Sequence, residues 1–241
     1  MTKVLFHDLA SIDYQKAWDL QESVFQQTIK IKLDNQKLNK EQQKENKYNL
    51  FFCEHPHVYT LGKSGKEQNL LIDSIQLNAK NAKFYKTNRG GDITYHGPGQ
   101  IVGYPIIDLE VFGLGIRKYI ESLEESIIKN IARYGLKGER LKGATGIWLD
   151  VGVTGKTRKI AAIGVRTSRY ISMHGFAFNV NTNLDYFSYI NPCGFIDKGV
   201  TSLEKELGRK LDIEIVKKEL LEDMTEVFGW ELMKYSKVLS Q

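Results

Sequence analysis

The sequence predicts a single α/β (α+β) domain over residues 1–241, built on a mixed, largely antiparallel sheet that is flanked by helices. Three observations support this fold class. A chain of 241 residues with 41% hydrophobic composition is long enough to bury one sizeable core. Many strand-like segments follow one another in hairpins, which favours antiparallel pairing over a doubly wound sheet. The sequence also contains no internal repeat, low-complexity segment or convincing linker that would divide it.

Two long helices are indicated by cap residues and apolar periodicity. The first is capped by Asp13 and is predicted to run to about Ile31. The polar run 34–47 that follows is expected to be a solvated helix end or loop without a function. The second helix opens at residues 114–116 and ends near Gly135, a plausible C-cap. Its buried stripe is predicted from apolar residues spaced three or four apart: Ile116, Ile120, Leu123, Ile127 and Ile131.

Two further helices are predicted near the C-terminal end of the chain. Thr201 and Glu204 form a capping-box pattern, and Gly208 ends the short helix that they begin. Asp212 begins the last helix and Gly229 stops it. The strands are predicted at residues 49–53, 58–62, 83–87, 101–107, 146–151, 159–166 and 172–180.

The most unusual stretch of the chain is Arg89–Pro105, which holds five glycines and two of the four prolines. Glycine allows another group to approach the backbone closely, so we interpret this stretch as a backbone-lined cradle between two strands. A tight connection without a ligand is the commoner use of such a segment. The spacing of the glycines matches neither a dinucleotide-binding fingerprint nor a Walker A loop.

Charge, hydropathy and the numbers of cysteines and histidines limit the partners, the location and the kinds of site that we expect. The net charge of +5 comes from 34 basic and 29 acidic residues without a concentrated basic stripe, so no nucleic-acid partner is expected, whereas an acidic protein partner is compatible. No apolar run is long enough to span a membrane. Two cysteines, Cys53 and Cys193, make no disulfide framework, and a reducing cytoplasm is the expected location. His55 and His57 lack the further ligands that a metal site needs.

Cys193 is the candidate nucleophile, because its Asn-Pro-Cys-Gly context is typical of a sharp turn that exposes a thiol. Cys53 lies in an apolar aromatic run and is expected to be an inert core thiol. A free thiol is mostly protonated at neutral pH, so Cys193 needs a cation or base nearby. Lys159, His96 and His174 are all candidates for that role, and the residues alone leave the choice open.

Five ordered motifs resemble those of the lipoyl(octanoyl) transferases, which belong to the biotin/lipoate protein ligase superfamily. They are H-P-H-V-Y-T-L-G, R-G-G-D-I-T-Y-H-G-P-G-Q, K-I-A-A-I-G-V-R, H-G-F-A-F-N-V and N-P-C-G-F. The resemblance extends from Phe51 to Phe195. It implies a ligase-like catalytic domain, an acyl-accepting Cys193 and a partner Lys159. It places the acyl-substrate contacts at Arg89, Gly90, Gly91, Asp92, Ile93, Thr94, Tyr95, His96, Ala162, Ile163, Gly164, Gly175, Phe176 and Ala177.

The resemblance also implies an activity and partners. An octanoyl (or lipoyl) group would pass from acyl carrier protein to Cys193, and then to a lysine of lipoyl domains in 2-oxoacid dehydrogenases or the glycine cleavage H protein. No cofactor or metal is expected, and the family suggests a monomer. Lys159 would stabilise the thiolate and then help to remove the proton of the acceptor amine, while Ile163 and Phe176 would line an acyl tunnel. The alternatives are an ATP-dependent lipoate or biotin protein ligase and a non-catalytic acyl- or partner-binding protein.

Overall fold

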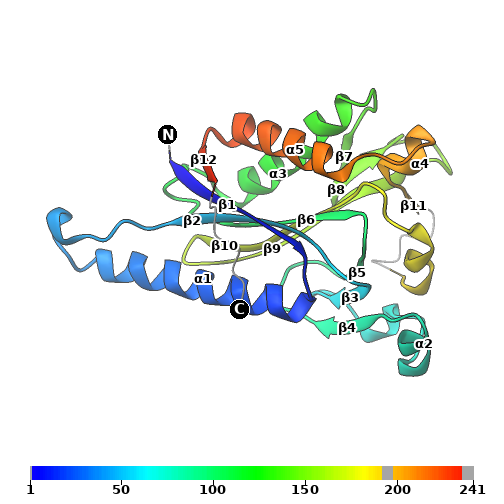
Figure 1. The fold of residues 1–241 in the computed structure, drawn as a ribbon, viewed down its shortest axis with the longest axis horizontal. Coiled ribbons are helices and arrows are strands. Elements are labelled where there is room, and N and C mark those ends of the chain that lie inside the picture. The colour runs from blue at the N-terminus through cyan, green and yellow to red at the C-terminus, as the bar shows by residue number, and fades with distance from the viewer. Residues whose placement is uncertain (1, 192–197, 235–241) are drawn as a thin grey trace.

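The fold is a mixed α/β arrangement around one large sheet, seen here in a computed structural model that describes residues 2–191 and 198–234 (Figure 1). Within those ranges the large sheet has nine strands and a smaller sheet has three. The order in the large sheet is β12-β1-β2-β6-β10-β9-β8-β7, and β11 also pairs with β9. Its strands are β1 (Lys3–Ser11), β2 (Tyr48–Glu54), β6 (Gln100–Ile106), β7 (Glu139–Leu141), β8 (Ala144–Leu149), β9 (Arg158–Ser168), β10 (Ile171–Asn179), β11 (Gly199–Val200) and β12 (Glu231–Lys234).

Antiparallel pairing predominates in the large sheet, as the sequence predicts. The run from β2 through β6, β10, β9 and β8 to β7 is antiparallel throughout. The parallel pairs are β1 with β2, β1 with β12, and β11 with β9. The small sheet has the order β4-β3-β5 and consists of β3 (Val58–Leu61), β4 (Lys83–Lys86) and β5 (Ile93–His96).

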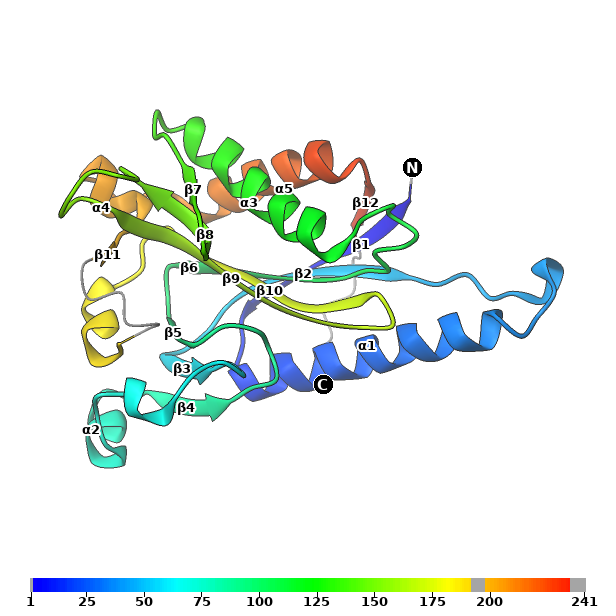
Figure 2. The ribbon, with the colours of Figure 1, turned by 180° about the vertical axis from the view of Figure 1, so that it is seen from behind.

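Helices cover both faces of the large sheet. In Figures 1 and 2, α3 (Ile116–Ala132) and α5 (Ile213–Phe228) lie over one face, whereas α1 (Tyr14–Asn35) lies along the other beside the small sheet. Two short helices, α2 (Ser74–Ala79) and α4 (Leu203–Leu207), lie at the periphery. One apolar core fills the α3–α5 side and includes Leu123 and Leu220, and a second lies beneath α1 and includes Phe25 and Met173.

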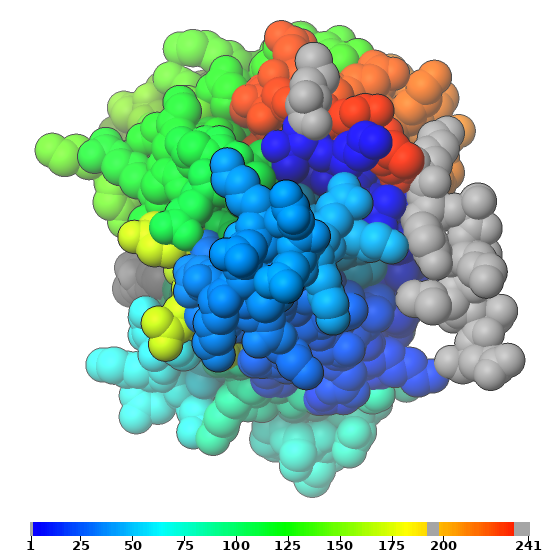
Figure 3. Space-filling model, turned by 90° about the vertical axis from the view of Figure 1, so that its left-hand side faces the viewer, coloured from blue at the N-terminus to red at the C-terminus, as the bar shows by residue number. Residues whose placement is uncertain are grey.

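Local cap residues account for most helix boundaries. Asp13 accepts hydrogen bonds from the backbone N–H groups of Gln15 and Lys16 at the start of α1. Asp212 caps α5 in the same way, and Gly229 ends it in the left-handed conformation. The polar run that follows α1 is largely exposed and projects from the face seen in Figure 3. These predicted boundaries are confirmed, although α1 continues to Asn35, four residues beyond the predicted end.

The predicted capping box of α4 is wrong by one residue. Ser202 is the N-cap, and its side chain accepts the N–H of Lys205. Thr201 instead continues the pairing of β11 with β9, since its N–H donates to the carbonyl of Lys159 at 2.9 Å. The cradle also differs from the prediction, because β5 lies inside it and pairs with β3. The strands β1, β7, β11 and β12 and the helix α2 are additions that the sequence analysis did not identify.

Candidate functional site

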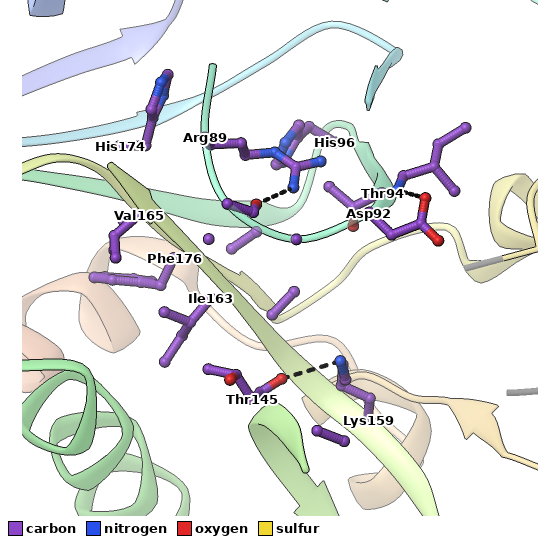
Figure 4. Close-up of a pocket in the computed structure, with 18 of the residues that line it drawn as sticks. Arg89, Asp92, Thr94, His96, Thr145, Lys159, Ile163, Val165, His174 and Phe176 are labelled. Atoms are coloured by element: carbon purple, nitrogen blue, oxygen red, sulfur yellow. Dashed lines mark hydrogen bonds between the residues drawn. The ribbon is translucent and has the colours of Figure 1, made fainter. Parts of the chain in front are cut away.

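A cavity of about 830 Å³ opens where β9 continues beyond the end of β8. β8 pairs with β9 between Arg158 and Ala161, whereas β10 pairs with β9 as far as Ser168. Beyond Ala161, therefore, the outer edge of β9 faces the cavity instead of β8. Figure 4 shows side chains that line it, which come from β9, β10, the glycine-rich cradle and the start of β8.

The cavity collects nearly all of the residues that the sequence analysis selected. Fifteen of them line it: Arg89, Gly90, Gly91, Asp92, Ile93, Thr94, His96, Lys159, Ala162, Ile163, Gly164, His174, Gly175, Phe176 and Ala177. Tyr95 does not line the cavity, because its side chain packs in the core of the small sheet, where its hydroxyl is 2.7 Å from Nδ1 of His57. Cys193 lies outside the described residues. Asn191 and Lys198, which are described on either side of it in the chain, both line the cavity.

The cradle backbone is clamped between β9 and the turn that follows β3. On one side, the N–H of Gly90 donates to the carbonyl of Val165 at 2.9 Å. On the other side, the N–H groups of Lys63 and Ser64 donate to the carbonyls of Arg89 and Gly91 at 3.0 and 3.1 Å. A Cβ atom at Gly164 would lie 2.9 Å from the carbonyl oxygen of Gly90, so this close approach requires glycine in β9.

Arg89 is buried, and its guanidinium group stabilises the structure of the site through hydrogen bonds to protein groups. It donates to the carbonyl of Thr60 at 2.6 Å, to the hydroxyl of Thr60 at 2.9 Å and to the carbonyl of Gly90 at 2.9 Å. Hydrogen bonds from a charged group are stronger than neutral ones, so this contact holds β3 against the cradle. Asp92 is tied in similarly, because its carboxylate accepts from the side chain of Asn69 at 2.7 Å and from the N–H of Ile93 at 2.6 Å.

His96 is held in a hydrogen-bond chain with a defined direction. Arg89 donates to the hydroxyl of Thr60, so that hydroxyl donates onward to Nε2 of His96. At the other end the amide nitrogen of Gln100 donates to the carbonyl of Tyr95, so its oxygen accepts from Nδ1–H of His96 at 2.8 Å. Burial lowers the pKa of His96 to about 3, and the ring is neutral at pH 7. Both ring nitrogens are thereby committed within the protein.

His174 lies at the far end of the cavity from Lys159 (Figure 4). Its Nε2 is 2.6 Å from the side-chain oxygen of Asn88, and its ring lies 6.3 Å from that of Trp18 in α1. Burial, with Arg89 nearby, lowers the pKa of His174 to about 3, so this ring is also neutral. A neutral imidazole carries no charge that would stabilise a thiolate, so of the three basic residues that the sequence analysis left open, Lys159 remains the candidate.

Lys159 presents its ammonium group at the β8 end of the cavity. Nζ donates to the carbonyl of Thr145 at 3.1 Å and lies 4.5 Å from the centre of the Trp148 ring. Trp148 is itself fixed by its indole N–H, which donates to the carbonyl of Ala144 at 2.9 Å. A cation over an aromatic face is favourable. Sequence analysis missed Thr145 and Trp148 because both depend on the register of β8 against β9.

The wall toward α3 is apolar. Ile163 and Val165 on β9 and Phe176 on β10 point to this side, where Ile116 and Ile120 of α3 complete it. The cavity therefore combines an apolar wall with a cationic group at one end, an arrangement that accommodates a hydrocarbon chain with a polar reacting end.

Two kinds of feature are absent from the described part of the chain. Among residues 2–191 and 198–234, no group of three or more His, Cys, Asp or Glu side chains is arranged to hold a metal ion. In the same residues no helix has the length and apolar character required to cross a lipid bilayer.

Cys53 is buried beneath α1, as expected for a core thiol. Its sulfur lies 3.4 Å from Nε2 of His55, and burial raises its pKa far above that of a free thiol. His55 in turn contacts the hydroxyl of Tyr104 at 2.8 Å and the carbonyl of Ile12 at 2.8 Å. These contacts use both nitrogens of the His55 ring within the protein.

Comparisons with known proteins show the family of this chain. Residues 13–225 match the family model described as lipoyl protein ligase A/B catalytic domain. An octanoyltransferase of Parabacteroides distasonis is 53% identical over 229 residues, which cover 95% of this chain and 100% of that protein. An octanoyltransferase of Christiangramia forsetii is 54% identical over 231 residues, covering 95% and 97%.

Solved structures show the same fold at low sequence identity. A bi-partite lipoate protein ligase from Thermoplasma acidophilum superposes with a TM-score of 0.69 at 13% identity, over 99% of this chain and 88% of that one. A lipoate-protein ligase A bound with ATP gives 0.66 at 14% identity, over 99% and 90%. The chain belongs to the lipoyl protein ligase A/B catalytic-domain family, and it matches the two octanoyltransferases named above over nearly their whole length.

Proposed function

We propose that this acyltransferase moves an octanoyl group from acyl carrier protein to a lysine of a lipoyl domain through a thioester on Cys193. The observation that supports it best is the cavity, which joins an apolar wall to the ammonium group of Lys159. The described residues on both sides of Cys193 line the same cavity. The octanoyltransferases that match more than nine-tenths of the chain support the identity of the acyl group.

The first step is thioester exchange. The thiolate of Cys193 attacks the carbonyl carbon of the octanoyl thioester, a new C–S bond forms, and the C–S bond to the carrier breaks. Lys159 holds the proton that Cys193 gave up and passes it to the departing thiolate of the carrier, so the amine of Lys159 is neutral when the second step begins. Lys159 contributes by stabilising the thiolate electrostatically. The exchange is close to isoenergetic and therefore requires no ATP.

The second step forms an amide. The amine of the acceptor lysine attacks the thioester carbonyl, the C–N bond forms, and the thiolate of Cys193 leaves. The attacking amine must lose a proton, which Lys159 accepts in this proposal. Ile163 and Phe176 hold the octanoyl chain during both steps. Arg89–Thr94, His96, Ala162, Gly164, Gly175 and Ala177 shape its binding site, whereas the buried Tyr95 acts only through the small sheet.

The proposed donor is octanoyl-acyl carrier protein, and the proposed acceptors are the lipoyl domains of 2-oxoacid dehydrogenases and the glycine cleavage H protein. We place the whole reaction in one catalytic domain, residues 1–241, acting as a monomer. In support, residues from Tyr14 to Val200 of one chain line the cavity. An ATP-dependent ligase is the weaker candidate, because proteins that are 53% and 54% identical over 95% of this chain are octanoyltransferases.

The decisive experiment is intact-mass measurement after mixing the protein with octanoyl-acyl carrier protein in the absence of ATP, followed by peptide mapping. We expect an octanoyl adduct on Cys193 that disappears when a lipoyl domain is added. Cys193→Ala should abolish the adduct, whereas the matched control Cys53→Ala should retain it. Modification of the lipoyl domain only with ATP and free octanoate would establish a ligase instead.

Lys159→Arg separates the two steps, since arginine keeps the charge but does not accept a proton at neutral pH. We expect Cys193 to acylate while transfer to the amine slows by about 10²-fold or more. The control is Lys156→Arg in the exposed turn before β9. Equal loss of both steps would show that Lys159 only positions the reacting groups.

A further inference from the structure

Glu124 is a buried carboxylate in α3 that the proposed reaction does not use. Its side chain is 8% exposed. One carboxylate oxygen, Oε2, accepts from Nε of Arg140 at 2.9 Å. The other, Oε1, accepts from the backbone N–H of Gly146 at 3.0 Å. This second contact points from the helix into the strand that forms the end of the cavity.

The N–H of Gly146 and the carbonyl of Thr145 belong to the same peptide group. That carbonyl accepts from Nζ of Lys159 at 3.1 Å. The peptide bonds of the described residues are trans, so the N–H and the C=O of this group point in opposite directions. A buried carboxylate therefore lies on one side of the peptide, and the ammonium of Lys159 lies on the other.

The backbone at this point is shaped for that arrangement. Gly146 has φ of +120°, and a Cβ there would lie 2.5 Å from the carbonyl oxygen of Ala161, so only glycine is accommodated. The register of β8 against β9 also shifts between Ile147 and Trp148. This irregularity gives the Thr145–Gly146 peptide partners outside the usual ladder: α3 for its N–H and the cavity for its carbonyl.

The Glu124 carboxylate at the N–H of this peptide affects the carbonyl that binds Lys159. An anion at the N–H of a peptide polarises that group and makes its carbonyl oxygen a better acceptor. The carbonyl then holds an ammonium group more strongly than an unpolarised carbonyl does. We propose that Glu124 is a positioning residue for Lys159 and acts through the Thr145–Gly146 peptide. Its kinetic consequence rests on the proposed role of Lys159, but the positioning itself does not.

Glu124→Gln tests the positioning, because glutamine has the same shape without the charge. The readout is the rate at which trace acetic anhydride labels Lys159 in the folded protein, measured by peptide mass spectrometry. We expect a rise of about fivefold, because a charge-supported hydrogen bond is replaced by a weaker one. Labelling of the exposed Lys142 is the internal standard.

Asp223→Asn is the matched control. Asp223 is also a buried carboxylate, 2% exposed, and it pairs with Arg133, the C-cap residue of α3, as Glu124 pairs with Arg140. The control should disturb the packing of α3 comparably yet leave the labelling of Lys159 unchanged. An unchanged rate in folded Glu124→Gln, or an equal rise in both variants, would overturn the inference.

Arg140→Gln gives an independent test with the opposite sign. Arg140 is 41% exposed and competes for the charge of Glu124, so its removal should strengthen the hold on Lys159 and slow its labelling by about twofold. If Glu124→Gln does not fold, Arg140→Gln alone tests whether Glu124 positions Lys159. Unchanged or faster labelling of Lys159 in Arg140→Gln would refute the positioning. Transfer kinetics separate the positioning of Lys159 by Glu124 from the proposed catalytic role of Lys159. If labelling of Lys159 changes while transfer from acylated Cys193 stays normal, the positioning is retained and the catalytic role is rejected.

Discussion

Replacing Gly164 with alanine tests whether the cradle must lie directly against β9. The new Cβ would lie 2.9 Å from the carbonyl oxygen of Gly90 and 3.3 Å from Cδ of Arg89, whereas ordinary contact begins at 3.4 Å. The oxygen cannot move alone, because it accepts from the guanidinium of Arg89, and the N–H of Gly90 is bonded to Val165. The whole segment has to shift by about half an ångström.

The expected cost is about 2 kcal/mol, within the usual range for overpacking a rigid site. In a chain of this size that lowers the melting temperature by about 4–8 °C. Displacement of the cradle should also reduce octanoyl transfer by about tenfold, since small misplacements of binding groups affect rate strongly. Differential scanning calorimetry and a transfer assay with octanoyl-acyl carrier protein measure the two effects.

Gly199→Ala is the matched control for the stability measurement. Gly199 pairs with the same strand β9, but among the described residues its added Cβ would meet only Cβ of Arg158, at 3.4 Å. We expect this variant to be as stable as the parent or slightly more so, because alanine loses less backbone entropy than glycine. If Gly164→Ala melts at the same temperature as Gly199→Ala, the close approach of the cradle to β9 is not a constraint on the fold.

Three further predictions concern titration and thiol reactivity. His96 and His174, whose pKa values burial lowers to about 3, stay neutral in the fold while the unfolded chain takes up protons below pH 6.5. The free energy of unfolding in urea should therefore fall from pH 6.5 toward pH 4 by about 1.4 kcal/mol per pH unit for each ring, and a flat profile would contradict this. Hydrogen bonds from Arg158 lower the pKa of Glu206 in the folded protein. The contribution of the Glu206 carboxylate to the free energy of unfolding is therefore complete above pH 4.5 and is lost as the pH falls through the lower folded-state pKa. In thermal melts, Glu206→Gln should destabilise the protein at pH 7 and much less at pH 3. Cys53 should resist Ellman's reagent until the chain is unfolded, and two fast-reacting thiols in the native protein would show that it is not protected.

Segments whose structure depends on local chemistry were predictable from the sequence. The caps at Asp13, Asp212 and Gly229 follow from short-range hydrogen bonding and the left-handed conformation that glycine allows. The buried residues Leu123, Ile127 and Ile131 of α3 follow from helical periodicity, whereas Ile116, also predicted to be buried, is 44% exposed at the start of the helix. The glycine-rich cradle could be recognised because its composition permits close backbone contact.

Features that depend on tertiary register were not predictable in this way. β1 is held by two parallel partners that are far apart in the chain, β2 and β12, so no local pattern indicates it. Ser202 replaces Thr201 as the cap of α4 because Thr201 is engaged with Lys159 on β9. Glu124 resembles any polar residue of an amphipathic helix until the contact with Gly146 is seen.

The hydrogen-bond partners of the titratable groups distinguish residues that hold the site together from the residue proposed to take part in the reaction. Arg89 and Asp92 bind neighbouring protein groups, and His96 is neutral with both ring nitrogens engaged. Substitutions in the cradle should therefore change how the acyl chain fits, and they should affect acylation and transfer together. Lys159 has a different position, because its side chain lines the cavity and its strand pairs there with β11, which follows Cys193 in the chain. A change there should divide the two steps, and this contrast distinguishes a shaped binding site from a group that takes part in the reaction.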